Sequence, residues 1–371
     1  MLLAALSNES IGWTIFIVVT LGLIAYAIVN VVRAGKAEVG SEIEVAPNRK
    51  PYYDDEELEG PKLDRTLTLA LGMLMLIAVG LPFYWLMEPG REHNAAKDFN
   101  ETFIKKGDAM FAPTAEGGFN CAGCHGVGGV GGVAPYNLTQ PDGTIKVVTW
   151  KAPALNTVLL RYSREEVTFI LVYGRPFSPM PAWGTEGGGP LNDQQIQNLV
   201  DYLESIQITP EASQQAAQDE LTKMMGMKTD AGAPLYKSEG EALFNMGLTD
   251  GFAGGAYSCA RCHTQEWSYA SSPSDIADHS GCGAFGPSLC GTTQVQFPKD
   301  ADHVDFVTLG SEIGKKYGVH GQGEGRMPGF GEKPEEPPVF WLNDNKPRTP
   351  GPGMVSVDLI EKVVQYERGL K

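Results

Sequence analysis

Positive charge is scarce in this chain. Its 371 residues include 29 Lys and Arg against 45 Asp and Glu, which leaves a formal net charge of −16. Nucleic-acid binding depends on basic residues that neutralise phosphates, so this balance argues against a nucleic-acid partner. It favours a basic docking partner that is steered by charge, although an acidic surface that only maintains solubility would leave the same balance.

Charge is absent altogether from two long stretches, residues 11–32 and 66–87. A helix of that length extends about 33 Å, enough to cross a bilayer. No basic segment precedes the first stretch and no small-residue cleavage site follows it, which favours a retained anchor over a cleaved signal peptide. We therefore expect two transmembrane helices, with a buried helix of a soluble domain as the alternative for each stretch.

Lys and Arg are missing from residues 1–10 but occur between the two stretches and at their edges. They are Arg33, Lys36, Arg49, Lys50, Lys62 and Arg65. Because basic residues hold a loop in the cytoplasm, both chain ends are expected on the opposite side. The sequence thus predicts a multi-pass protein of the cell membrane, with everything after about residue 87 extracytoplasmic.

Cysteine is scarce too, and four of the six lie in two C-x-x-C-H motifs, residues 121–125 and 259–263. This spacing is the attachment signature of c-type haem, because it places two thiols on one face of a helical turn. A zinc site would need a further Cys or His pair at similar spacing, and Cys282 and Cys290 are too far apart to supply it; a thiol redox pair is the other alternative. We expect two covalently bound haem c groups, attached through Cys121, Cys124, Cys259 and Cys262, with His125 and His263 as proximal iron ligands.

The remaining two cysteines, Cys282 and Cys290, close a short glycine-rich loop. A disulfide between them fits an oxidising compartment, and two free buried thiols are the alternative.

Two methionines are candidates for the sixth iron position. Met180 and Met327 each precede a proline in a glycine-punctuated loop that contains an aromatic residue. A thioether favours Fe(II) and raises the potential, whereas core packing is the ordinary role of methionine. Competitors near the second site are Met246, Met354, His279, His303 and His320. Pro135 and Pro287 are expected to border the two haems, with a carbonyl accepting the N–H of the proximal histidine.

The chain also contains an internal duplication. Gly107 and Phe111 precede the first motif with the spacing of Gly240 and Phe244 before the second, and each half ends in an amphipathic helical pattern. Capping patterns at Ser163–Glu166 and Asn192–Gln195 predict helix starts in the first half. The expected architecture is all-α, with a membrane anchor at residues 1–97, a first haem domain at 98–206, a linker at 207–235 and a second haem domain at 236–371.

These features together resemble class I cytochrome c domains, over about residues 98–206 and 236–370. The resemblance rests on the Gly/aromatic first helix, the C-x-x-C-H motif, the segment around Pro135-Tyr136-Asn137-Leu138, the methionine loop and the closing helix. It implies an all-α haem fold in which the first and last helices cross, and one-electron transfer with no catalytic residues.

Two such domains behind membrane helices resemble the cytochrome c subunits of respiratory complexes. One relative is the di-haem subunit of actinobacterial quinol:cytochrome c reductases, which normally carries its anchor after the haem domains. The other is the di-haem subunit of cbb-type oxidases, which places anchors first, but its Trp-Asp-Gly and Asn-Pro-Leu-Pro-Arg-Trp-Trp junction is absent here.

The resemblance implies a membrane-bound electron carrier within a respiratory chain. Its partners would be cytochrome b and Rieske subunits of a reductase or, alternatively, terminal oxidase subunits, with a mobile electron carrier as a further partner. A di-haem cytochrome c peroxidase is the alternative from another class, and it would need one iron with an open sixth position.

Overall fold

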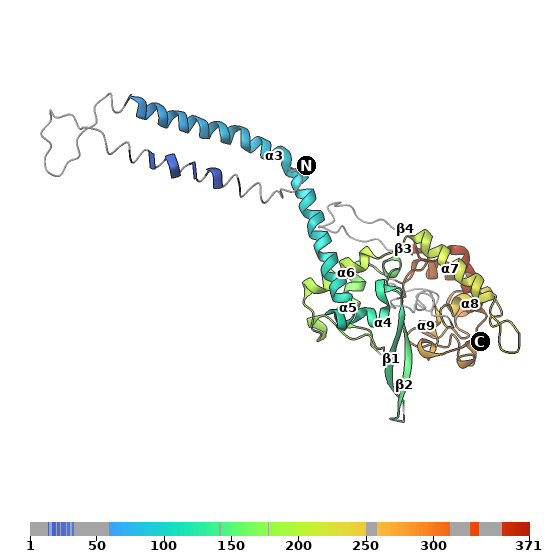
Figure 1. Cartoon of the computed structure of the whole chain (residues 1–371). Coiled ribbons are helices and arrows are strands. Elements are labelled where there is room, and N and C mark those ends of the chain that lie inside the picture. The colour runs from blue at the N-terminus through green and yellow to red at the C-terminus, as the bar shows by residue number, and fades with distance from the viewer. Residues whose placement is uncertain are drawn as a thin grey trace, which may run out of the picture. The chain divides into compact units, whose positions relative to one another are not determined.

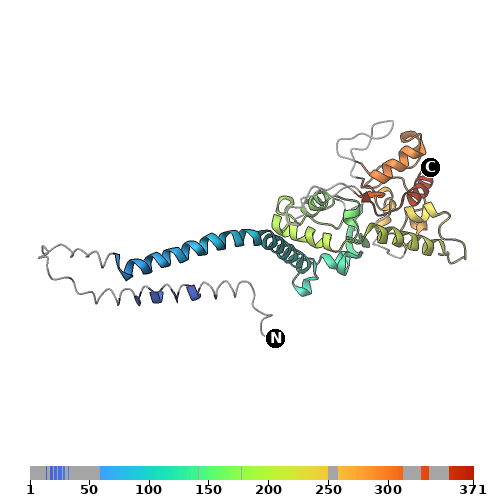
Figure 2. The same ribbon diagram turned by 90° about the horizontal axis from the view of Figure 1, so that it is seen from above.

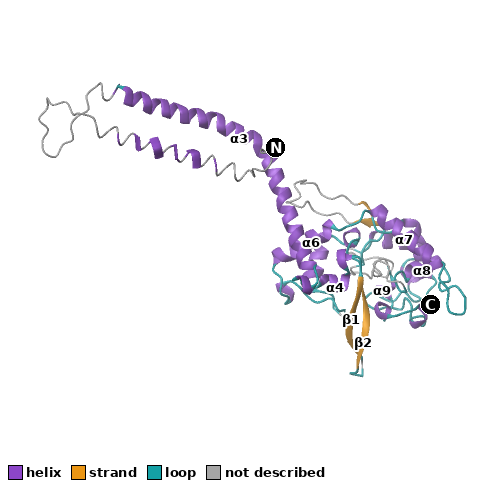
Figure 3. Cartoon of the chain, in the orientation of Figure 1, coloured by secondary structure: helices purple, strands orange, loops and turns teal. Residues whose placement is uncertain are grey.

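The computed structural model describes residues 59–140, 142–176, 178–249, 258–311, 327–333 and 351–371, together with short pieces of residues 14–32. It divides into two compact units, Met1–Pro89 and Gly90–Lys371. Most described elements are helices, and the described strands form two small two-stranded sheets (Figures 1 and 3).

Helix α3 (Pro61–Phe111) contains the expected second span, residues 66–87. Among the described residues it is the one helix long and apolar enough to cross a membrane, judged by length and composition. Its apolar side chains in this span are exposed. Membrane anchoring is therefore supported for this helix, while the expected first span, residues 11–32, lies largely outside the described residues.

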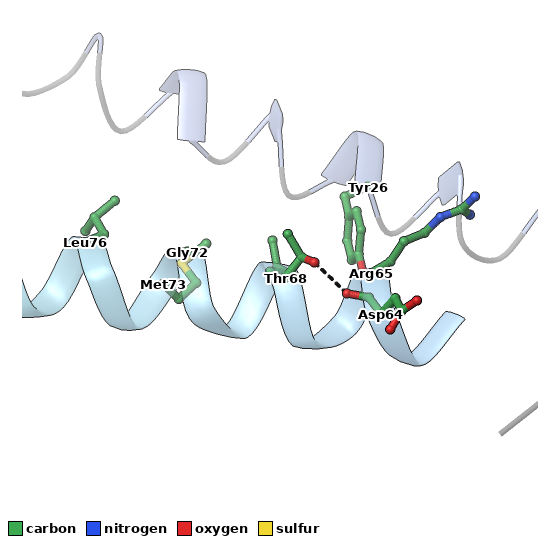
Figure 4. A pocket seen from close by; sticks show the side chains of 8 residues that line it. Tyr26, Asp64, Arg65, Thr68, Gly72, Met73 and Leu76 are labelled. Atoms are coloured by element: carbon green, nitrogen blue, oxygen red, sulfur yellow. Dashed lines mark hydrogen bonds between the residues drawn. The ribbon is translucent and has the colours of Figure 1, made fainter. Parts of the chain in front are cut away.

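Within the first unit, Tyr26 lies against the first turns of α3. Figure 4 shows its side chain between Thr68 and Arg65, and together with Asp64 they line a shallow pocket. The Thr68 hydroxyl donates to the Asp64 carbonyl over 2.6 Å, within the helix. An aromatic ring and charged side chains thus meet at one end of the apolar part of α3, as is typical of a membrane interface.

In the second unit, the end of α3 crosses helix α6 (Asp193–Ser205) at Gly107. A Cβ atom on Gly107 would lie 2.6 Å from Cβ of Tyr202, so only glycine allows this approach. One turn later, the rings of Phe111 and Tyr202 lie 5.1 Å apart. The crossing buries Phe111 and the apolar face of α6 in one core.

The expected capping patterns are confirmed. Helix α5 (Arg164–Tyr173) begins at a capping box in which the Ser163 hydroxyl accepts from the Glu166 N–H and the Glu166 carboxylate accepts from the Ser163 N–H. Asn192 and Gln195 form the same reciprocal pair at the start of α6, over 3.0 Å each. These contacts satisfy backbone N–H groups that a helix start leaves without partners.

The same crossing recurs near the C-terminus between α8 (Glu239–Phe244) and α12 (Val357–Arg368). Figure 2 shows the two helices side by side, in yellow and red. A Cβ atom on Gly240 would lie 2.8 Å from Cβ of Tyr366, and the rings of Phe244 and Tyr366 lie 5.2 Å apart.

The second core draws on more of the chain than its own crossing. Helix α7 (Pro210–Met225) occupies most of the expected linker and contributes buried Ala217, Leu221 and Met224 to this core. The shorter helices of this half are α9 (Ala260–His263), α10 (Thr293–Gln296) and α11 (Asp300–Leu309).

An antiparallel hairpin departs from the all-α expectation. Strands β1 (Gly132–Thr139) and β2 (Ile145–Ala152) pair over eight residues each, with Pro135 opposite Thr149 (Figure 1). The signal was present: Asp142-Gly143 at the turn is followed by the β-favouring run Val147-Val148-Thr149-Trp150. A second sheet pairs β3 (Glu332–Lys333) with β4 (Gly351–Pro352).

The close helix crossings predict that Gly107→Ala and Gly240→Ala each destabilise the protein by about 1–3 kcal/mol, because the added methyl group overpacks the contact. Thermal unfolding of detergent-solubilised full-length protein, followed by circular dichroism, measures the loss. Gly90→Ala is the matched control, because no atom lies within 4 Å of its Cβ position. Equal behaviour of the Gly107 and Gly90 variants would contradict the close packing.

Candidate functional site

The first C-x-x-C-H motif forms its own short helix, α4 (Cys121–His125). Asn120 precedes it in the left-handed conformation, with φ 66°, and Gly126 ends it with φ 76°. Cys121 and Cys124 are therefore one turn apart, with His125 in the last turn. The second motif also forms a short helix, but with different ends: Cys259 is itself the N-cap of α9, and Thr264, in an extended conformation, follows its last residue, His263.

The environment of the thiols does not suit a thiolate site. Burial raises the pKa of Cys121 to about 11 and that of Cys259 well above its usual value. Zinc ligands and redox-active C-x-x-C pairs need the opposite shift, towards the thiolate. Within the described part of the chain, no three His, Cys, Asp or Glu side chains gather to hold a metal ion.

A backbone carbonyl orients each motif histidine. The His263 Nδ1 lies 2.8 Å from the Pro287 carbonyl, the partner that the sequence suggested. The His125 Nδ1 lies 2.8 Å from the carbonyl of Pro153, not from that of Pro135. A carbonyl can only accept, so in both rings the proton is on Nδ1 and Nε2 remains available to a metal.

Pro135 instead lies in strand β1, so the expectation for this residue is corrected. The hairpin separates it from the end of β2, where the chain returns to the histidine at Pro153. The sequence held a better signal than the one that singled out Pro135. Pro153-Ala154-Leu155 shares a Pro-x-Leu pattern with Pro287-Ser288-Leu289, which Pro135 lacks.

The two imidazoles have different surroundings. A Cβ atom on Gly286 would lie 2.7 Å from Cε1 of His263, so the absence of a side chain there lets the chain pass directly beside the ring. Burial lowers the pKa of His125, the bond to Pro153 opposes this, and the positive charge of Arg261 lowers the pKa further. A lowered pKa keeps this imidazole neutral, the form that ligates iron.

The two methionine loops follow the ends of helices α5 and α11, which stop at glycines of nearly equal conformation. Gly174 has φ 70° and ψ −166°, and Gly310 has φ 77° and ψ −170°. In each loop the N–H of the residue after this glycine donates to the methionine carbonyl: Arg175 to Met180 over 3.1 Å, and Ser311 to Met327 over 2.8 Å.

A further backbone hydrogen bond holds each methionine loop to the helix before it. The N–H of Trp183 donates to the Leu171 carbonyl over 2.9 Å, and that of Phe330 to the Val307 carbonyl over 3.1 Å. Met180 packs at the edge of the first core, as does Cys121, and Met327 packs on the core that contains Cys259. Both loops therefore bring their methionine to the core against which a motif cysteine of the same half also packs.

Three of the competing ligands of the second site, Met354, His279 and His303, have other partners. Met246 and Met354 are fully buried in the core, and the Met354 sulfur lies 3.9 Å from a guanidinium nitrogen of Arg161. His303 pairs with Glu367 over 3.2 Å, and both side chains are buried. His279 contacts Asp278 and the Gln265 carbonyl, and His320 lies outside the described residues. These contacts favour Met327 over Met354, His279 and His303, whereas Met246 lines the apolar pocket at Cys259 and remains a competitor.

A disulfide joins Cys282 and Cys290, eight residues apart. It closes the loop 282–290, which contains Pro287 and in which the N–H groups of Gly283 and Gly286 donate to the carbonyls of His263 and Cys262. The crosslink thus restrains the segment that delivers the Pro287 carbonyl to the histidine.

The arrangement fits haem c in both halves. Each half has two thiols one turn apart, an imidazole with Nε2 available and a pinned methionine loop, and an apolar pocket lies at Cys259. This pocket is lined by Ala217, Leu243, Met246, Cys259, Val307, Phe330, Val355, Ile360 and Val363. A haem bound at either motif would supply reversible one-electron chemistry at iron.

Comparison with known families supports the first half of this assignment. The family model described as cytochrome c oxidase, cbb3-type, subunit III matches residues 105–203, less than a third of the chain. The match contains the motif Cys121–His125 and Met180. It supports a class I cytochrome c domain here, with covalently bound haem c and electron transfer. Neither a curated protein nor a solved structure gives a significant match.

The methionine loops predict the effect of replacing each thioether by a side chain of similar volume. Met180→Leu and Met327→Leu should each convert the iron of their own half from low-spin to high-spin, because leucine offers no ligand atom. Ferric absorption and electron paramagnetic resonance spectra measure the change. Met224→Leu, which alters a buried methionine of the second core outside the pocket lining, should leave the spectra as they are. An unaltered spectrum for Met327→Leu would assign the second iron another ligand.

Proposed function

We propose that this protein is a membrane-bound di-haem cytochrome c that passes single electrons within a respiratory chain. The observation that carries the proposal is the repetition of one arrangement in both halves: a glycine helix crossing, a C-x-x-C-H helix, a proline carbonyl on the histidine and a pinned methionine loop. The family match supports the first half directly, and the shared geometry extends the same role to residues 236–371.

The residues around each site favour electron transfer over bond-making catalysis. His125 and Met180 would hold the iron of the first haem and His263 and Met327 that of the second, so neither iron would offer a position to substrate. Rigid holding of both ligands keeps the geometry alike in the two oxidation states. A peroxidase would need one open or displaceable ligand, and no contact of the described methionine loops favours that.

For the membrane topology we propose two spans with both haem sites on the extracytoplasmic side. Helix α3 supplies the apolar length of one span, and residues 11–32 have the length and lack of charge for the other. The six Lys and Arg residues at positions 33–65, against none at 1–10, support a cytoplasmic connection. Covalent haem attachment and the Cys282–Cys290 disulfide fit the same side.

The parent complex we propose is a quinol:cytochrome c reductase of the bc type. A cbb-type oxidase is the second candidate, and the family match favours it because the matching model carries that name. The match covers one haem domain and neither membrane span, however, so it bears on the domain more than on the assembly. Electrons would arrive from quinol oxidation and leave to an oxidase or a mobile carrier.

The haem content tests the central proposal. The wild-type chain should contain two covalent haems, measured by pyridine haemochrome absorbance per chain and by intact mass. Changing both motif cysteines to serine, at Cys121 and Cys124 or at Cys259 and Cys262, should leave one haem, because each pair supplies both thioethers of its own porphyrin. The two variants serve as controls for each other. A wild-type content of one haem would refute the di-haem function.

Copurification tests the parent complex. Tagged full-length protein extracted in a mild detergent should bring down cytochrome b and Rieske subunits, identified by mass spectrometry, and its haems should be reduced by added quinol. Recovery of a catalytic oxidase subunit instead would support the cbb-type assignment and contradict the reductase. Recovery of the chain alone, with no reduction by quinol, would contradict both.

A further inference from the structure

The two haem sites are joined by a reciprocal contact between strand β2 and the segment around helix α9. The Arg261 guanidinium donates to the backbone carbonyl of Lys151 over 2.6 Å. The Lys151 ammonium donates in turn to the backbone carbonyl of Ala270. Both side chains therefore reach across to the backbone of the other half, and each bond crosses more than 100 residues of sequence.

Each end of this contact lies next to a proximal histidine. Lys151 precedes by two residues Pro153, whose carbonyl holds His125. Arg261 lies between the two motif cysteines of the second site and two residues before His263. A path therefore links the two imidazoles. It runs from His125 through its hydrogen bond to the Pro153 carbonyl, along the chain to Lys151, through the hydrogen bond to Arg261 and along the chain to His263.

Aromatic packing makes the contact rigid. Trp267 is fully buried, and its ring lies 4.8 Å from the Arg261 guanidinium carbon and 5.7 Å from the Lys151 nitrogen. Next to Lys151 in strand β2, the ring of Trp150 lies 5.7 Å from that of Tyr269. Both cations are held over one immobile ring, where desolvation strengthens a cation–π contact.

The hairpin therefore has a role at both sites. Strand β2 delivers Pro153 to the first site at its end and, two residues earlier, offers Lys151 to the second site. A loop could supply the proline carbonyl alone, but it would not hold the Lys151 carbonyl at a fixed position against Arg261. Pairing with β1 removes that freedom.

We propose that Arg261 is a positioning residue for electron transfer between the two haem sites. Its hydrogen bond to the Lys151 carbonyl holds the proximal sides of the two sites together and provides a bonded route between them. In the step it serves, one iron is oxidised by one electron and the other is reduced by one, with no bond broken. This inference rests on the di-haem function proposed above.

The experiment compares Arg261→Met, Arg261→Lys and Arg368→Gln in the full-length protein. Methionine keeps an unbranched stem over Trp267 but loses the charge and the hydrogen bond, whereas lysine keeps the charge on a shorter side chain. Arg368 is the matched control: its guanidinium also donates to a backbone carbonyl, that of Phe297 over 2.7 Å, but within the second half. Haem content, both midpoint potentials and the rate of electron transfer between haems after rapid photoreduction are measured.

Arg261→Met should retain two haems and transfer electrons between them about tenfold more slowly at equal driving force, as expected for lost positioning. Arg261→Lys should be slowed less and should keep wild-type potentials, because the charge remains. Arg368→Gln should match the wild type. A wild-type rate in Arg261→Met with two haems bound would overturn the inference and leave the di-haem function intact. Should Arg261→Met lose a haem, Arg261→Lys decides: a wild-type rate there overturns the inference. A single haem in the wild type would refute the function itself.

Discussion

The hydrogen bond between a proline carbonyl and the Nδ1 of a motif histidine is the contact on which both sites depend. A histidine that directly follows a C-x-x-C pair could turn its ring in several directions, and either nitrogen could carry the proton. The carbonyls of Pro153 and Pro287 remove both freedoms at once, over 2.8 Å each. Everything that brings these prolines to the rings therefore serves the sites: strand β2 in the first half, and the disulfide-closed loop in the second.

The methionine loops, which are proposed to supply the second iron ligand of each half, are held by a different constraint. A helix that ends at a glycine with positive φ turns the chain back, and the methionine carbonyl then accepts from the residue after that glycine. Gly174 and Gly310 do this in the same conformation, and a Cβ atom at either would lie within 2.7 Å of backbone atoms of the returning loop. A methionine with flexible χ angles is thus mounted on a backbone that cannot move freely, which suits a ligand that must stay bound in two oxidation states.

The two halves differ in how they connect these shared parts. The first inserts a paired hairpin between its motif and its proline, and the second inserts a crosslinked loop. The hairpin also reaches the other half, where Lys151 meets Arg261 and Trp267. The same insertion that orients one histidine therefore also joins the two sites, and the local fold and the proposed electron path share a single element.

Short-range chemistry was readable from the sequence alone. The thiol spacing, the histidine that follows it and the capping boxes at Ser163 and Asn192 depend on neighbours within a turn or two. The apolar length of α3 was equally plain. Even the hairpin had a signal in Asp142-Gly143, which was outweighed by the all-α expectation of the resembling family.

Tertiary structure decided which distant groups meet. Pro135 and Pro153 both follow the first motif, and only the pairing of β1 with β2 carries one away from His125 and returns the other to it. The same holds for Arg261 and Lys151, since nothing local marks a carbonyl 110 residues away as the partner of a guanidinium. Such contacts depend on how whole elements pack, because burial and hydrogen bonding select among many candidate partners only once the chain has closed on itself.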